Sequence, residues 1–208
     1  MINRRSLTTR IVTLVTISAL VLGCVVSVLL LRLRSEMMDA RSRSPRIAVE
    51  AALSQVAWFE AQEASGALSR EEAQRQALEV LKRLRFEGGN YVWVNDLSPK
   101  MVMHPMNAAL DGTDLTNNAD PNGKRLFIEM VNGVKGSPTH DALVDYLWPK
   151  PGATQPVPKV SYVKRSERWS WVVGAGVYTD DVRAVVNRVL ISASLATRRR
   201  SRVSMSSI

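Results

Sequence analysis

The chain has 208 residues and a formal net charge of +9, with 28 Lys and Arg against 19 Asp and Glu. The excess lies at the two ends, because residues 49–180 carry 14 basic and 16 acidic side chains. A nucleic-acid partner, which needs a basic folded surface, is therefore not expected. A hydrophobic content of 46% argues against intrinsic disorder, and a single cysteine, Cys24, excludes an intrachain disulfide or a Cys-based metal cluster.

Residues 11–31 read IVTLVTISALVLGCVVSVLLL and contain no charged side chain. As a helix they cover about 31 Å, close to the hydrocarbon core of a bilayer. The run is long for a cleaved signal peptide and apolar on every face, unlike a buried core helix. Residues 11–33 are therefore predicted to be a transmembrane anchor. The arginines before the span favour a cytoplasmic N-terminus, residues 1–10, with the rest of the chain outside.

Two helices are expected after the span. Apolar residues recur at helical spacing over residues 34–66, and Gly66 is typical of a helix C-cap. Pro45 predicts a kink or break near Ser44. Ser69 and Glu72 form a capping-box pattern that begins a second helix, which is expected to end before residues 88–90.

The pattern then changes to short strands rich in β-branched and aromatic residues. A polar loop over 105–123 and a short helix over 125–134 separate the second strand from the third, and residues 178–196 return to a helical pattern. The fold class is therefore α+β, with long N-terminal helices beside an antiparallel sheet of about five strands. The predicted strands are Tyr91–Asn95, Met101–His104, Asp141–Trp148, Lys159–Lys164 and Trp169–Val177.

Five sequence blocks occur in a characteristic order: GGNYVWVNDLSPKMVMHP, LDGTDLTNNADPNGKRLF, VDYLWPKPG, PVPKVSYVK and WSWVVGAGVYTDDV. Over residues 34–182 the chain resembles the single Cache domain of the second type, the extracellular sensor of many methyl-accepting chemotaxis receptors and some sensor kinases. The resemblance implies a PAS-like sheet, a long membrane-proximal helix that could pair two copies, and one small-ligand pocket without a cofactor. It also implies a periplasmic domain and a small organic acid such as acetate, propionate, pyruvate or lactate. Together with the one predicted span, residues 11–33, it leads us to expect a single-pass protein of the bacterial inner membrane.

Chemoreceptors of this kind continue into a second span and a cytoplasmic signalling module. Residues 189–196 are only weakly apolar, and eight helical residues cover about 12 Å, too short for a bilayer. Residues 183–208 are therefore expected to form a C-terminal helix and an Arg-rich tail. Two explanations stay open: a truncated receptor, or a protein that signals through a partner.

A buried organic acid needs a cation or several hydrogen-bond donors, together with apolar walls. Lys159 is the predicted charge partner, with His104 and Tyr146 as donors. Alternation along a strand places Tyr146 and Trp148 on one face, and does the same for Tyr91 with Trp93 and for Lys159 with Ser161. Met103, Lys124 and Arg125 are weaker candidates. The predicted ligand-binding set is Trp93, His104, Tyr146, Trp148 and Lys159.

Each of these residues also has a purely structural interpretation. The aromatic residues could simply pack the sheet, His104 could cap a strand end, and Lys159 could be an exposed lysine that protects a sheet edge. An enzyme is not expected, because the chain has two histidines and no G-x-S-x-G motif. The run from Asp111 to Asp114 lacks the order of an EF-hand loop, so no metal is expected. The remaining alternative is a structural or interaction remnant of a receptor that no longer binds ligand.

Overall fold

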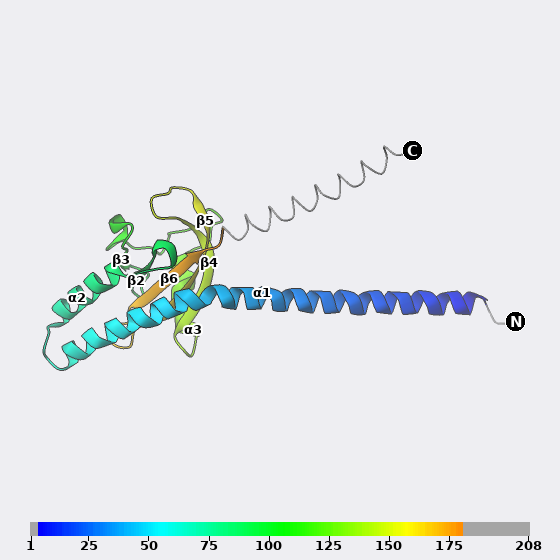
Figure 1. The fold of residues 1–208 in the computed structure, drawn as a ribbon, viewed down its shortest axis with the longest axis horizontal. Coiled ribbons are helices and arrows are strands. Elements are labelled where there is room, and N and C mark those ends of the chain that lie inside the picture. Colours follow the sequence, from blue (N-terminus) through cyan, green and yellow to red (C-terminus); the bar gives the residue numbers. More distant parts are fainter. Residues whose placement is uncertain (1–3, 181–208) are drawn as a thin grey trace. The chain divides into compact units, whose positions relative to one another are not determined.

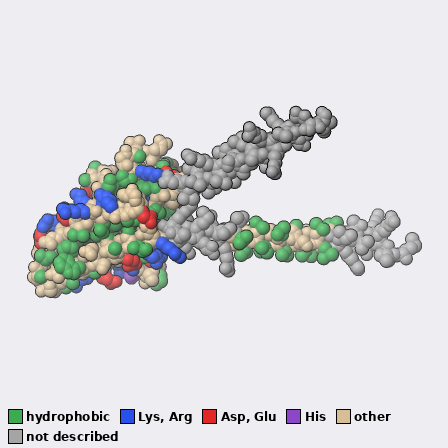
Figure 2. Space-filling model, in the orientation of Figure 1, with side chains coloured by type: hydrophobic (Ala, Val, Ile, Leu, Met, Phe, Trp, Pro, Cys, Tyr) green, Lys and Arg blue, Asp and Glu red, His purple; other side chains and the backbone are tan. Residues whose placement is uncertain are grey.

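The computed structural model describes residues 4–180. The chain divides into two compact units between residues 41 and 42, and each unit is described separately. The first helix, α1 (Arg4–Ala64), begins in the first unit. Its window Val12–Leu29 has a mean hydropathy of 2.5 and is long and apolar enough to cross a membrane. Apolar side chains cover this window (Figure 2), and none of it is buried within the protein.

The helix continues through Pro45 without interruption, so the break expected near Ser44 is wrong. Proline removes one backbone donor, and the hydrogen bonds of the neighbouring turns are sufficient to keep the segment helical. The expected C-terminal signal is confirmed, because α1 ends at Ala64 and Gly66 adopts a φ of +77°. This left-handed conformation is accessible to glycine without steric cost.

The second helix, α2 (Arg70–Arg83), begins at the predicted cap. The Ser69 hydroxyl accepts a hydrogen bond of 3.2 Å from the Glu72 backbone N–H, and the Glu72 carboxylate pairs with Arg75 and Gln76. The helix ends at Arg83, before residues 88–90 as expected, because Leu84 is extended and the next two residues join the sheet. These two residues are the strand β1 (Arg85–Phe86), too short to show any alternation in the sequence.

Within the described residues the sheet has six strands in the order β1-β2-β6-β5-β4, with β3 also paired to β2, and every pairing is antiparallel (Figure 1). The predicted α+β fold and five strands are confirmed, and β1 is the addition. Tyr178, the first residue of the helix expected over 178–196, belongs to β6, and residues 181–196 of that helix lie outside the described residues. The remaining elements are η1 (Glu87–Gly89), β2 (Asn90–Asn95), β3 (Met101–Met103), η2 (Ala108–Leu110), α3 (Leu126–Gly136), β4 (Asp141–Pro149), β5 (Pro156–Arg165) and β6 (Val172–Tyr178).

Two apolar cores lie on opposite faces of the sheet. One core joins α1 and α2 to a sheet face that includes Val92 and Tyr162. The other joins α3 to a face that includes Tyr91, Trp93 and Tyr146. Alternate residues of β2 therefore belong to different cores, as the period of two in the sequence predicts. The second face carries the aromatic and cationic residues that concern the site.

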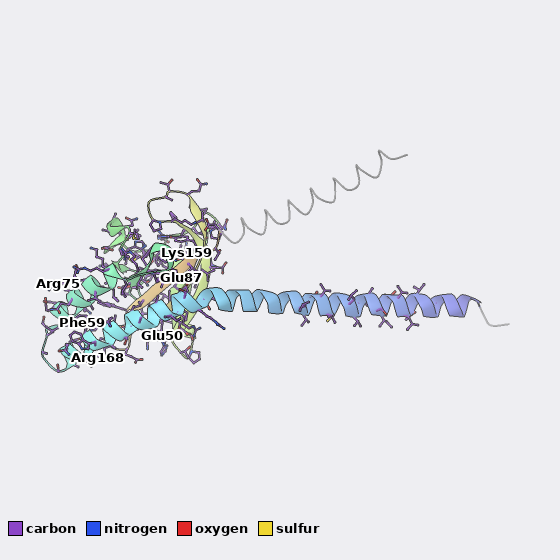
Figure 3. All side chains as sticks on the ribbon, in the orientation of Figure 1. Glu50, Phe59, Arg75, Glu87, Lys159 and Arg168 are labelled. Atoms are coloured by element: carbon purple, nitrogen blue, oxygen red, sulfur yellow. The ribbon has the colours of Figure 1, made fainter. Side chains whose placement is uncertain are left out.

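The turn between β5 and β6 is fixed to the end of α1. Glu60 is 3% exposed, and its carboxylate accepts hydrogen bonds from the backbone N–H groups of Arg168 (3.1 Å) and Trp169 (2.9 Å). Figure 3 labels Arg168 in this turn and Phe59, the residue that directly precedes Glu60 in α1. A buried carboxylate requires such donors, so this contact holds the two central strands against the long helix.

Candidate functional site

A row of three side chains crosses the middle of the sheet. Lys159 of β5 lies directly opposite Tyr146 of β4 on one side and opposite Tyr178 of β6 on the other. Directly paired residues on adjacent strands bring their Cβ atoms to about 4.5–5.5 Å. The pairing therefore places a cation between two phenols, although the three residues are far apart in the sequence.

The Lys159 side chain is enclosed by aromatic rings. It is 1% exposed, and its ammonium donates a hydrogen bond of 3.1 Å to the Tyr91 hydroxyl. The ammonium also lies 4.2 Å from the ring centre of Tyr91, 5.4 Å from that of Trp93 and 4.8 Å from that of Tyr178. Cation–π contacts compensate for only part of the hydration that a buried ammonium loses.

Among residues 4–180, Lys159 forms no ion pair. Burial lowers its pKa from 10.5 to about 7, since the charged form loses hydration without gaining an opposite charge. An ammonium has three N–H donors, and here one of them has an acceptor. The site thus holds a cation with unused hydrogen-bonding capacity and, in the part of the chain that the structure describes, no counter-ion.

His104 lies beside this cation, just after β3. It is 3% exposed, and its ring is 5.0 Å from Tyr91 and 6.2 Å from Trp148, measured between ring centres. Burial and the neighbouring Lys159 charge lower its pKa to about 4, so the imidazole is neutral at physiological pH. Within residues 4–180 its Nδ1 atom is buried without a hydrogen-bond partner. Most buried polar atoms have such a partner, so this atom retains hydrogen-bonding capacity beside the cation.

The remaining predicted residues complete the same cluster. The Tyr146 hydroxyl lies 2.9 Å from the Ser161 hydroxyl, and the Tyr146 and Trp148 rings are 6.2 Å apart. Burial raises the pKa of Tyr146, of Tyr91 and of Tyr178, so all three phenols stay protonated and can donate hydrogen bonds. The Trp93 indole N–H instead donates to Asn95 at 3.2 Å, which leaves its ring as an apolar wall.

Two glycines of β6 make room for these side chains. A Cβ atom added to Gly174 would lie 2.3 Å from the Trp93 ring. At Gly176 it would lie 2.0 Å from the Ser161 hydroxyl and 2.8 Å from Cε of Lys159. Glycine inside a strand often marks such close approach. The two glycines are therefore part of the site, although neither can bind a ligand through a side chain.

The structure brings all five predicted residues into one cluster around Lys159. The edge-lysine interpretation of Lys159 is wrong, since β5 lies between β4 and β6 and the side chain is buried. Three weaker candidates lie elsewhere. Lys124 pairs with Asp145 and Glu129, Arg125 is exposed at the start of α3, and Met103 belongs to the core that contacts α1 and α2.

Tyr178, Gly174 and Gly176 contribute to the site without having been predicted from the sequence. The alternation G-A-G within the last strand is a signal that could have identified the close approach at residues 174 and 176. Asp111 and Asp114, considered as cation ligands, instead organise the loop. Asp111 accepts from the His104 backbone N–H at 2.7 Å, and Asp114 accepts from the Thr116 backbone N–H at 2.8 Å.

This arrangement of sheet, helices and buried cation agrees with the comparison with known protein families. The model of single Cache domain 2 matches residues 37–192. The chain therefore belongs to the single Cache domain 2 family, as its sequence blocks predict.

Relatives with known roles are receptors and kinases. The chain is 42% identical over 183 residues to the methyl-accepting chemotaxis protein McpP of Pseudomonas putida, covering 88% of this chain and 33% of that protein. It is 32% identical over 114 residues to the sensor histidine kinase MctS of Rhizobium johnstonii, covering 55% of this chain and 24% of that protein. The chain thus spans a third or less of the length of these relatives.

Two solved structures share the fold with high identity. The periplasmic sensor domain of a chemotaxis protein has 49% identity and a TM-score of 0.64, and the match covers 71% of this chain and 99% of that domain. A Cache chemosensory domain studied for carboxylic acid recognition has 41% identity and a TM-score of 0.64, with 72% and 96% covered. The homologous domains are sensor modules of chemoreceptors.

Proposed function

We propose that this chain is a membrane-anchored periplasmic sensor that binds a small monocarboxylate, of the acetate, propionate, pyruvate or lactate class, at Lys159. The observation that carries the proposal is the buried Lys159 ammonium, which has no counter-ion among the described residues 4–180. A carboxylate would supply the missing charge and would accept the unused ammonium donors. The related Cache domain that recognises carboxylic acids supports the same ligand class.

The surrounding residues suit a short acid. The Tyr91 hydroxyl lies 3.1 Å from the ammonium, Tyr146 is directly opposite Lys159 in the sheet, and the His104 ring contacts Tyr91. In the proposed complex these groups contact the carboxylate or an α-hydroxyl or α-keto group. Trp93 and Trp148 offer apolar surface for one or two methyl groups. In this proposal the site binds the acid and does not convert it. A non-enzymatic role agrees with the sensor roles of the relatives.

Thermal unfolding tests the proposal directly. A ligand at a hundred times its dissociation constant adds about 2.7 kcal/mol to the stability of the native state, which corresponds to a rise in Tm of several degrees. We expect this rise with C2–C4 monocarboxylates and its loss in Lys159→Ala. Lys164→Ala is the matched control, because Lys164 lies on the same strand but pairs with Glu50 outside the site. A wild-type chain that no monocarboxylate stabilises would favour the ligand-free remnant instead.

The apolar window of α1 supports anchoring in the inner membrane. Residues 11–33 would form the anchor, with residues 1–10 in the cytoplasm and the Cache domain, proposed to span residues 34–182, in the periplasm. The described part of this segment is helical and exposes apolar side chains on all sides of Val12–Leu29, which suits a lipid environment better than water.

The exposed face of α1 supports a homodimer. Ile47 and Trp58 are 70% and 55% exposed. Ala51 and Ser54 lie between them and are also exposed, so the four residues follow the spacing of four, three and four residues. This is the heptad spacing that pairs two helices in a coiled coil. A second copy of the chain, packed along the same stripe, would cover the two large side chains.

A further inference from the structure

A groove lies beside the cluster around Lys159. This groove has a volume of about 730 Å³ and is bounded by η1, the end of β6 and the turn after β4. Glu87, one of its lining residues, is labelled in Figure 3 together with Lys159. The groove is lined by Arg85, Glu87, Gly88, Gly89, Asn90, Met106, Lys150, Pro151, Val177 and Tyr178.

One side chain belongs to both the groove and the cluster. Tyr178 lines the groove, while its ring centre lies 4.8 Å from the Lys159 ammonium. Its backbone position is directly opposite Lys159 in the pairing of β5 with β6. The ring therefore covers the cation on the side where β6 ends. The Tyr178 side chain is half-buried, as expected for a ring with one side against the cluster and the other side facing the groove.

The ring is held in this place from the groove side. The Tyr178 hydroxyl donates a hydrogen bond of 2.7 Å to the Pro149 carbonyl, and the Lys150 ammonium lies 5.8 Å from the ring centre. The strand pairing and this hydrogen bond together fix both ends of the side chain. Tyr178 is thus held in place between the cluster around Lys159 and the groove.

We propose that Tyr178 sets the chain length of the acid that the sensor accepts, because its ring closes the Lys159 cluster against the groove. This inference rests on the proposed function. A carboxylate bound at Lys159 would direct its aliphatic tail among the aromatic rings, where Tyr178 limits the space. Without the ring, the tail would extend into the groove, where Met106, Pro151 and Val177 offer apolar contacts.

The test is the affinity of the full chain, purified in detergent, for straight-chain acids from acetate to hexanoate, measured by calorimetry. For Tyr178→Ala we expect each added methylene beyond butyrate to increase the affinity about threefold to fourfold, as burial of a methylene predicts. The wild type is expected to lose affinity over the same range. Tyr178→Phe is the matched control. It retains the ring and removes the hydroxyl bond to Pro149, so its preference should remain that of the wild type.

The outcomes separate the two proposals. If the wild type binds no acid of the series, the proposed function fails and this inference fails with it. If the wild type binds short acids and Tyr178→Ala keeps the same preference for chain length, only the inference is overturned. The same holds if Tyr178→Phe alters the preference as much as Tyr178→Ala. Should Tyr178→Ala not fold, Tyr178→Leu replaces it, because leucine is shorter than tyrosine and apolar. This variant is also expected to prefer a longer acid than the wild type does.

Discussion

The proposed binding of a carboxylate to Lys159 should depend on pH in a definite direction. The free site has a lysine whose pKa is lowered to about 7, and only the protonated form attracts an anion. Small carboxylic acids are ionised throughout the neutral range. The apparent affinity therefore follows the protonated fraction of Lys159, which decreases as the pH rises through the pKa of the free site.

The size of the effect follows from this pKa. About nine tenths of the free sites are protonated one unit below the pKa, and about one tenth one unit above it. Because the apparent dissociation constant is the intrinsic one divided by the competent fraction, it should rise about tenfold between pH 6 and pH 8. The other titratable groups that face Lys159 do not change over this interval, since His104 has a pKa of about 4 and the phenols have raised pKa values.

Calorimetry in two buffers with different ionisation enthalpies measures both the affinity and the protons taken up on binding. We expect an uptake of about half a proton per site at pH 7, approaching one at pH 8. Lys164→Ala should show the same pH profile, because its side chain lies outside the cluster. An affinity that is constant from pH 6 to pH 8, without proton uptake, would refute the assignment of Lys159 as a lysine of lowered pKa that becomes charged on binding.

Three further predictions concern other parts of the chain. Gly176→Ala should destabilise the domain by about 1–3 kcal/mol and weaken acid binding, because its Cβ would overlap Ser161 and Lys159. Gly136→Ala, whose Cβ meets no atom within 4 Å, is the control, and equal denaturant midpoints would contradict the prediction. Trp58→Ala should weaken self-association in analytical ultracentrifugation, whereas Val80→Ala, an exposed apolar residue of α2, should not. Cys24 should react with a membrane-impermeant maleimide only after detergent is added, while a cysteine introduced by Ser98→Cys should react from the periplasmic side of intact membranes.

Local periodicity is the reason why much of the site could be predicted. The alternation of residues along β2 assigns Tyr91 and Trp93 to one face and Val92 to the other, and the two cores have this composition. The cap at Ser69 and the C-terminal signal at Gly66 are equally local. Each of these features depends on residues within one turn or one strand, so the sequence is sufficient to predict it.

The contribution of Tyr178 could not be predicted in the same way. Its place opposite Lys159 results from the pairing of β6 with β5, and β6 pairs on its other side with β2, about 80 residues earlier in the chain. Local patterns carry no information on which strands become neighbours. For the same reason the sequence left open whether Lys159 lies at an exposed edge, because its burial depends on having a strand on both sides.

The burial of Lys159 makes stability and binding respond to pH with opposite signs. In the unfolded chain the lysine keeps a pKa near 10.5, and in the folded chain burial lowers it to about 7. Between these values the unfolded state binds more protons, so the stability of the unliganded domain increases with pH at up to about 1.4 kcal/mol per unit. Below about pH 7 Lys159 is charged in both states, and the folded protein bears the full cost of a buried ammonium.

Acid binding has the reverse dependence, because it is strongest where the charge is present. Lys159→Met should therefore stabilise the unliganded domain at pH 6, remove the rise in stability toward pH 10 and abolish acid binding. The free energy of unfolding from urea titrations at several pH values measures the first two effects, and calorimetry measures the third. A buried lysine without a ligand would produce the first two effects but not the third, so the loss of acid binding is the result that assigns the ligand to Lys159. Unchanged stability in this variant, with binding retained, would show that the ammonium neither costs stability nor holds the ligand.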